Sequence, residues 1–356
     1  MQLFIGTYTD ENDSEGIYRC DFDTQTGEMS KCRVAHAADN PAYVLGNEDG
    51  TILYAVNERN LSAEPESAAV RAYGIDREDG TLSLIGEQPV DISGPCHLGM
   101  APDQRAVFAA CYQGGGVAMV PLDANGAPQP SISVTHVGSS VHPERQTSPH
   151  AHSANVTADG TRLVVADLGI DKTIVYAIAY NPPGLTELSS IASSPGAGPR
   201  HLAFAPRGDR AYLMGEMDMT ITALSFEASS GTFAALQTIS TLTADAGHSA
   251  DGMDSTADVH VHPNGRFAYS SNRGPDSISI YAIDEKSGKL TLLCNEPTRG
   301  STPRGFRLST DGRWLVAANE MSDTLYSFAV DVDSGTLTAT GHLTQVPQPA
   351  SVAFVV

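Results

Sequence analysis

Charged and imidazole side chains recur at equivalent points of a repeated pattern in this sequence. Tight-turn pairs such as Asp159-Gly160 and Asn264-Gly265 join two short apolar segments at six places. Ionisable residues stand seven positions before or nine positions after such turns: His152, Arg200, Arg304, Glu58, Glu216, Arg273 and Glu320. An imidazole or a carboxylate can move a proton, and a guanidinium can hold an anion. Because unlike charges are costly to gather, we expect these side chains to converge on a ligand.

Two pairs of histidines offer a second kind of chemistry. His150 and His152 are two residues apart, as are His260 and His262, so each pair would share one side of a strand. This is a spacing that metal ligands use, and carboxylates such as Asp258 could add oxygen ligands. The arginines at the equivalent points would repel a cation, however. We therefore predict no metal site and no cofactor.

The sequence shows no covalent nucleophile. It contains no G-x-S-x-G segment, and its five cysteines are scattered without a CxxC pair. Cys96 occupies one of the equivalent points, beside His97, but a small buried side chain is the favoured interpretation. The cysteines also indicate neither a disulfide framework nor a cysteine-based zinc site.

The elements that position these residues are short strands. A segment such as HLAFAP precedes each turn, RAYLMGE or a similar segment follows it, and a third and an outer strand complete the unit. Four antiparallel strands in a repeat of about fifty residues form one blade of a β-propeller. Six turns define six blades, and the terminal segments SVAFVV and QLFIGTY supply the inner strands of a seventh. We predict an all-β, seven-bladed β-propeller, a single domain over residues 1–356, closed by its own terminal strands.

This arrangement brings the candidate residues to one face of the disc. Inner strands run from that face to the turn and second strands run back, so the start of the first and the end of the second lie together. Asn57, Asn272 and Asn319 stand eight positions after a turn. They either line a wet axial channel or tie adjacent blades through backbone hydrogen bonds.

The overall charge restricts the partners. The net charge of −21 would repel nucleic acid and anionic membranes. No run approaches the about 18 apolar residues of a membrane span, and the first residues, MQLFIGTYTD, lack the basic start of a signal peptide. We expect a cytoplasmic monomer that acts on a small molecule and binds neither nucleic acid nor membrane.

Several longer segments resemble a known family. GPRHLAFAPRGDRAYLMGE, HAHSANVTADG, ADVHVHPNGRFAYSSNRGPDSISIY and TPRGFRLSTDGRWLVAANE are similar to segments of the seven-bladed propeller lactonases. That family includes bacterial 6-phosphogluconolactonases and fungal 3-carboxy-cis,cis-muconate lactonizing enzymes. The resemblance covers nearly the whole chain and is strongest from His150 onward. The insert LSAEPESAAV after Glu58 and the segment HPERQTSP depart from the family pattern, and we expect both to shape the rim of the site.

The resemblance implies roles for individual residues. It makes His152, Arg200, Glu216 and Arg273 the catalytic residues. Either Glu216 or His152 would be the general base, and the other its partner or acid, with Arg200 and Arg273 as electrophilic clamps. Arg304 would hold a substrate carboxylate or phosphate. The further substrate-binding candidates are His150, His201, Asp258, Asn272, Glu320, Asp167 and Glu58.

The resemblance also implies the reaction. We expect the hydrolysis of a sugar lactone, with 6-phosphogluconolactone as the leading substrate. A lactonizing cycloisomerase of the carboxymuconate type would use the same four residues and is the second interpretation. A non-catalytic propeller that binds a protein or a metabolite on its rim is the third.

Overall fold

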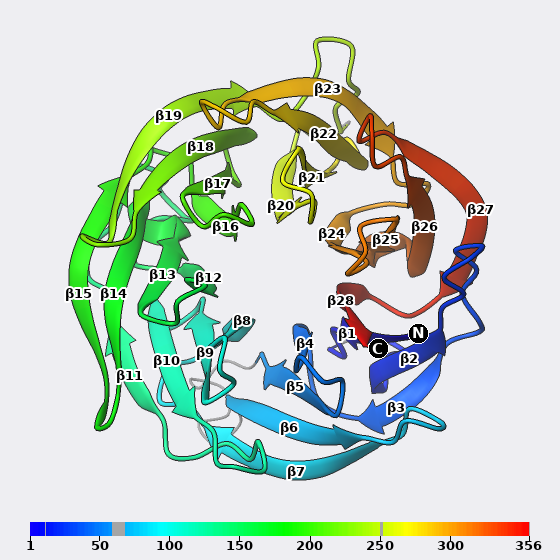
Figure 1. The fold of residues 1–356 in the computed structure, drawn as a ribbon, viewed down its shortest axis with the longest axis horizontal. Coiled ribbons are helices and arrows are strands. Elements are labelled where there is room, and N and C mark those ends of the chain that lie inside the picture. Colours follow the sequence, from blue (N-terminus) through cyan, green and yellow to red (C-terminus); the bar gives the residue numbers. More distant parts are fainter. Residues whose placement is uncertain (11, 59–67, 250–251, 356) are drawn as a thin grey trace.

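The chain forms a ring of seven β-sheets around a central axis (Figure 1). The structure is a computed structural model, and it describes residues 1–356 except 11, 59–67, 250–251 and 356. Each sheet has four antiparallel strands, so the predicted seven-bladed propeller is confirmed. Most of the insert LSAEPESAAV lies outside the described residues.

The strands occupy four concentric positions in the blades (Figure 1). The innermost are β4 (Val44–Gly46), β8 (Pro95–Met100), β12 (Ala151–Val156), β16 (Pro199–Phe204), β20 (Ser255–Val261), β24 (Pro303–Leu308) and β28 (Pro349–Val355). The second strands are β5 (Ile52–Asn57), β9 (Ala106–Cys111), β13 (Arg162–Asp167), β17 (Arg210–Gly215), β21 (Phe267–Arg273), β25 (Trp314–Asn319) and β1 (Gln2–Thr7). The third are β6 (Ala69–Ile75), β10 (Gly116–Pro121), β14 (Lys172–Tyr180), β18 (Thr220–Glu227), β22 (Ser277–Ile283), β26 (Thr324–Val330) and β2 (Gly16–Asp21). The outer are β7 (Leu82–Pro89), β11 (Ile132–Thr135), β15 (Pro183–Ala192), β19 (Thr232–Ser240), β23 (Leu290–Pro297), β27 (Leu337–Gln345) and β3 (Arg33–Ala37).

The ring closes as the sequence predicts. The C-terminal β28 pairs antiparallel with the N-terminal β1, with Phe4 opposite Ala353, and β2 and β3 complete the blade. The indole Nε1 of Trp314 donates to the carbonyl of Thr24 in this blade at 3.0 Å. The closure therefore pairs both terminal strands with each other and completes the seventh blade.

Buried aromatic residues tie neighbouring blades together. The hydroxyls of Tyr54, Tyr212 and Tyr269 donate to backbone carbonyls 66 to 76 residues away, each in the outer hairpin of the next blade. All three side chains are almost completely buried between sheets. Each supplies a large apolar surface with its polar end satisfied. In the described part of the chain no helix is both long and apolar enough to cross a membrane.

Irregularities at the start of the inner strands aim side chains at the axis. The pairing with the second strand shifts register between Pro95 and His97, between Pro199 and Leu202, and at matching points of other blades. A bulge of this kind places two successive residues where a regular strand would place one. Arg200 and His201 can therefore both face the channel.

Candidate active site

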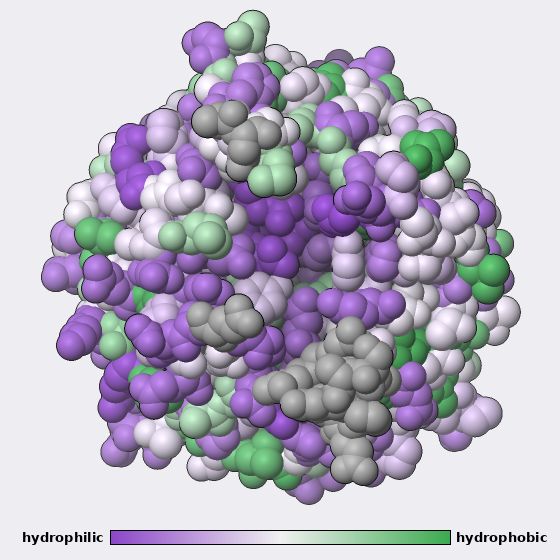
Figure 2. Space-filling model, turned by 180° about the vertical axis from the view of Figure 1, so that it is seen from behind, coloured by the Kyte–Doolittle hydropathy of each residue, from purple (hydrophilic) through white to green (hydrophobic). Residues whose placement is uncertain are grey.

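An axial cavity opens among the starts of the inner strands, with about 460 Å³ of empty space including its open mouth. Seen from the side opposite to that of Figure 1, the disc is hollowed at its centre and hydrophilic residues surround the hollow (Figure 2). The side chains that line the cavity and bear polar groups are Tyr8, Tyr43, Cys96, His152, Arg200, His201, Asp258, Arg304, Arg307 and Ser351.

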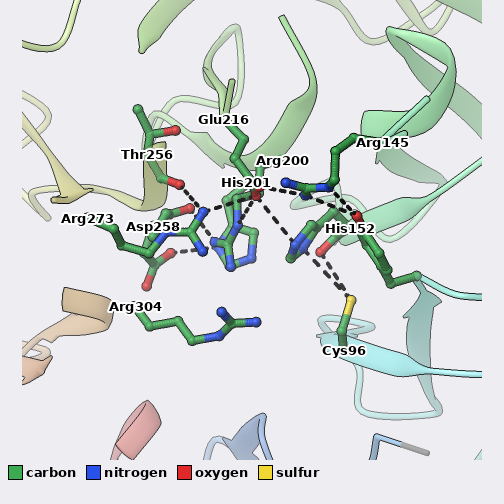
Figure 3. Close-up of polar contacts among 12 residues, drawn as sticks. Cys96, Arg145, His152, Arg200, His201, Glu216, Thr256, Asp258, Arg273 and Arg304 are labelled. Atoms are coloured by element: carbon green, nitrogen blue, oxygen red, sulfur yellow. Dashed lines mark hydrogen bonds and ion pairs between the residues drawn. The ribbon is translucent and has the colours of Figure 1, made fainter. Parts of the chain in front are cut away.

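Glu216 is held by three arginines beside this cavity (Figure 3). Its Oε2 lies 2.9 Å from Nε of Arg200 and 3.2 Å from Nη2 of Arg273, and its Oε1 accepts from Nη2 of Arg145 at 2.8 Å. Burial opposes the charge of Glu216, but Arg273, Arg200 and Arg145 outweigh it and lower its pKa to about 2. The carboxylate is therefore ionised at neutral pH and is a very weak base.

The backbone of β20 holds two of these arginines. Nη2 of Arg273 donates to the carbonyl of Thr256 at 2.8 Å, and Nη1 of Arg200 donates to the carbonyl of Ala257. Burial lowers the pKa of Arg273 to about 10, which still leaves it charged at neutral pH. Nη2 of Arg200 makes no hydrogen bond to any described residue, so it can donate into the cavity.

His152 lies between this cluster and Cys96. Its Nε2 is 3.8 Å from Oε2 of Glu216, and its Nδ1 is 3.8 Å from Sγ of Cys96. Burial, with the charge of Arg200, holds the pKa of His152 well below its usual value. Burial likewise raises the pKa of the Cys96 thiol. A neutral imidazole that can accept a proton thus lies next to a protonated, unreactive thiol.

Arg304 stands on the other side of the cavity with its own partners. Its Nη2 donates to the hydroxyl of Tyr8 at 2.7 Å, and its Nη1 lies 3.6 Å from Oε2 of Glu320. The Tyr8 hydroxyl in turn donates to Oε2 of Glu58 at 2.9 Å. In Figure 3, Arg304 has no hydrogen bond or ion pair with the other residues drawn. Glu58 and Glu320 therefore position Arg304 and lie behind it relative to the ligand space.

Two of the predicted substrate-binding residues lie away from the cavity. Asp167 and Asn272 are completely buried inside their blades. Asp167 accepts from the backbone N–H of His150 at 2.7 Å, and its other oxygen lies 2.5 Å from Nδ1 of His136. The amide of Asn272 donates to Oγ of Ser279 at 2.7 Å. Neither side chain borders the axial cavity, and Oδ1 of Asn272 has no hydrogen-bond partner among the described residues, so that they bind substrate stays a prediction.

His150 lies at the edge of the site rather than in the cavity. Its Nδ1 is 2.8 Å from the carbonyl of Tyr112, and its ring stacks on that tyrosine with centroids 4.5 Å apart. Tyr112 also accepts from Arg145 through its hydroxyl, at 3.0 Å from Nη2. His150 thus supports Tyr112, which supports Arg145.

His201 and Asp258 lie deeper along the axis. Nδ1 of His201 is 2.8 Å from Oδ1 of Asp258, and Oδ2 of Asp258 is 3.1 Å from Nε2 of His260. Asp258 also accepts the backbone N–H groups of Val259 and Phe306. With four donors around it, Asp258 is an organising group, and the pKa of its carboxyl is well below the usual range, since His260 and His201 outweigh the effect of burial.

Three functional candidates escape prediction from the repeat. Arg145 belongs to the HPERQTSP segment, which matches no repeat position, although we expect that segment to shape the rim. Tyr8 follows β1 just as Glu320 follows β25, but its blade has no turn between the inner strands from which to count. Arg307 follows Arg304 by three residues, and only the register shift between Pro303 and Gly305 places it toward the axis.

No metal-binding group appears among the described residues. In the chain outside 11, 59–67, 250–251 and 356, no three histidine, cysteine or carboxylate side chains are grouped so that they could hold an ion. The five cysteines are all free. Three arginines already contact the carboxylate of Glu216, so its oxygens are not open to a cation.

The buried histidines should make the protein less stable in acid. Burial, with the charge of Arg200, lowers the pKa of His201 to about 4. A histidine with a lowered pKa favours the folded state fully above its unfolded pKa of about 6.5, and this contribution is lost as the pH falls through the folded value. For His201 the difference corresponds to about 3 kcal/mol. We expect urea unfolding to give a free energy that falls steadily between pH 7 and 4, with a shallower slope in His201→Gln. An equal slope in that variant would contradict the assignment.

Fold and site together define a β-propeller whose axial cavity combines a proton acceptor with anion-binding arginines. A family model described as a seven-bladed β-propeller lactonase matches residues 2–354, and the chain belongs to that family. Membership makes it a lactonase, an enzyme that opens cyclic esters.

Named relatives are similar over most of their length. A 6-phosphogluconolactonase of Bacillus subtilis (strain 168) is 36% identical over 304 residues, which are 85% of this chain and 83% of that protein. A 6-phosphogluconolactonase of Formosa agariphila is 30% identical over 318 residues, 87% of each chain. The solved structure of a periplasmic gluconolactonase of Pseudomonas aeruginosa has 32% identity and a TM-score of 0.91, and the match covers 100% of this chain and 99% of that one.

Proposed function

We propose that the protein hydrolyses 6-phosphogluconolactone, with His152 as the general base and arginines as electrophilic groups, without a metal ion. The observation that carries this proposal is the axial cavity in which a neutral imidazole faces Arg200 and Arg304. The names of the relatives support a six-carbon sugar lactone as the substrate. Since one of these relatives is a gluconolactonase, the phosphate is the part of the proposal that most needs a test.

Each step of the hydrolysis has a residue in this site. His152 accepts a proton from water as the oxygen attacks the lactone carbonyl, and such help is worth roughly 10²- to 10⁴-fold. The carbonyl oxygen becomes an oxyanion, and Arg200 stabilises it with a hydrogen bond from its free Nη2. When the ring C–O bond breaks, the protonated His152 returns its proton to the departing ring oxygen. The product is an open-chain hydroxy acid.

Glu216 acts as a positioning residue in this scheme. A carboxylate with a pKa of about 2 accepts a proton too weakly to serve as the base. Its two oxygens instead fix the directions of Arg200, Arg273 and Arg145. Of the two candidate bases, we therefore favour His152.

A panel of three substrates tests the proposal. Freshly generated 6-phosphogluconolactone, glucono-δ-lactone and a 3-carboxymuconate are offered in turn, with spontaneous ring opening measured in the absence of protein. We expect the highest kcat/KM with the phosphorylated lactone. Preferred turnover of the carboxymuconate would favour a lactonizing cycloisomerase instead. No turnover of any of the three would favour a binding protein.

Arg304→Gln should raise the KM for the phosphorylated lactone much more than the KM for the unphosphorylated lactone. Arg304 borders the cavity beside Tyr8, to which it donates, and its planar guanidinium suits a phosphate. A charge-assisted contact to phosphate is worth about 1.5–3 kcal/mol, so KM for 6-phosphogluconolactone should rise roughly 10- to 100-fold. The KM for glucono-δ-lactone should change little. Equal losses with both substrates would show that Arg304 does not hold the phosphate.

The cellular setting is also proposed. Five free cysteines and a phosphorylated sugar substrate suit the cytoplasm. Because the terminal strands pair with each other and close the ring, we propose that the protein acts as a monomer. Its partner would be the small-molecule lactone, and it would bind neither nucleic acid nor membrane.

A further inference from the structure

A second cavity opens at the other end of the channel, toward the turns that join inner and second strands. Its lining includes the middle of several inner strands, with polar groups on His97, Asn155, His201, Asp258, His260 and Arg307. The empty space measures about 810 Å³ including its open mouth. His201, Asp258 and Arg307 border both cavities, whereas His152, Arg200 and Arg304 border only the first. The second cavity is therefore distinct from the proposed active site.

Arg307 brings an uncompensated positive charge to this cavity. Its guanidinium makes no hydrogen bond or ion pair with any described residue, although most other arginines near the axis are paired with carboxylates. Asp258, the carboxylate in the same lining, is already surrounded by His201, His260 and two backbone N–H groups. A guanidinium without an acceptor in a concave site is ready to bind an anion.

His97 adds a neutral donor beside it. The side chain is 7% exposed, and its Nδ1 accepts from the backbone N–H of Ala154 at 3.3 Å. Burial holds the pKa of His97 well below its usual value, so the neutral ring carries its proton on Nε2. That Nε2–H has no partner among the described residues. The Tyr43 ring packs against it at a tilt of 36°, with centroids 4.4 Å apart, and restricts its direction.

Acceptors complete the lining. Because Nδ1 of His201 donates to Asp258, Nε2 of the neutral His201 ring is free to accept. The side-chain Nδ2 of Asn155 donates to Oγ of Ser153 at 3.2 Å, and its Oδ1 remains as an acceptor. The cavity thus offers a fork for a carboxylate and acceptors for hydroxyl groups.

We propose that this second cavity, centred on Arg307 and His97, binds a small hydroxycarboxylate. Arg307 and the Nε2–H of His97 hold the carboxylate, and His201 and Asn155 accept hydroxyl hydrogens. The proposal does not depend on the identity of the substrate opened at the other end of the channel.

D-Gluconate is the probe, and the signals of ¹³C-labelled histidine rings are the readout. Signals of His97 and His260 report the second cavity, and that of His152 reports the first. We expect gluconate to shift the His97 and His260 signals saturably in the wild type and in Arg304→Gln. In Arg307→Gln the affinity read from these signals should fall at least about tenfold, since a charge-assisted fork is lost.

Matched variants and ligands decide the outcome. Arg313→Gln makes the same charge change at an exposed turn and should bind like the wild type. Arg307→Lys keeps the charge but loses the fork, so its affinity for gluconate should lie between those of the wild type and Arg307→Gln. It replaces Arg307→Gln if that variant does not fold. Acetate should bind more weakly than gluconate because it lacks hydroxyls. No saturable shift of His97 and His260, an undiminished affinity in Arg307→Gln, or equal affinity for acetate would overturn the proposal.

Discussion

Replacing His152 by glutamine should lower kcat/KM for lactone opening by roughly 10²- to 10⁴-fold, the contribution of a positioned general base. His152 is a neutral imidazole between the Glu216 cluster and the thiol of Cys96, and it borders the axial cavity. Because its pKa lies well below the usual value, the ring is unprotonated throughout the neutral range. The wild-type kcat/KM should therefore be flat from neutral to mildly alkaline pH and fall only in acid.

His150→Gln is the matched control. It removes a nearby imidazole of the same strand region that contacts Tyr112 and does not border the cavity. We expect its kcat/KM to stay within about tenfold of the wild type, since it removes no group that moves a proton. Comparable losses in the two variants would mean that the effect is structural and that His152 is not the base.

Replacing Arg200 by glutamine should lower kcat by about 10²- to 10³-fold, the loss found when an oxyanion donor is removed. Arg200 is 2% exposed and is fixed by Glu216 and the carbonyl of Ala257. Its remaining nitrogen is the preorganised donor for the charge that develops on the lactone oxygen. Because this interaction forms in the transition state, kcat should fall with little change in KM.

Stability is the confounding quantity in this variant. Arg200→Gln leaves Glu216 with Arg145 and Arg273, so part of the buried charge remains compensated. A thermal unfolding curve shows whether the variant is folded at the assay temperature, which separates lost stability from lost catalysis. Arg200→Lys is a second variant that keeps the charge without the fork. A rise in KM with an unchanged kcat would contradict the role of Arg200 as an oxyanion donor.

The fold could be predicted because turns and strands alternate with a fixed period. The turn at Asn264-Gly265 needs a residue with positive φ, which Gly265 supplies at +72°, and five similar turns set the register of the other blades. The blade built from both termini has no such turn, since β28 and β1 come from opposite ends of the chain. For that reason Tyr8 was missed although it occupies the same position as Glu320.

The site could be predicted only as far as the repeat places residues. Counting from the turns finds His152, Arg200, Glu216, Arg273 and Arg304, and the structure brings them together around one cavity.

Counting cannot tell whether a side chain points to the axis or back into its blade. Asp167 and Asn272 stand at equivalent points, yet the Asp167 carboxylate accepts and the Asn272 amide N–H donates inside the sheets. It also cannot place Arg145, whose segment has no counterpart in other blades, or foresee that three arginines make Glu216 a weak base.

Proton release from freshly generated 6-phosphogluconolactone is the most direct test of the account. The rate is followed at constant pH with the wild type, with the double variant His152→Gln/Arg200→Gln and with no protein. We predict that the wild type opens the lactone far faster than the spontaneous reaction and that the folded double variant returns to that background. A wild-type rate equal to the background, or a double variant as fast as the wild type, would contradict catalysis at this cavity.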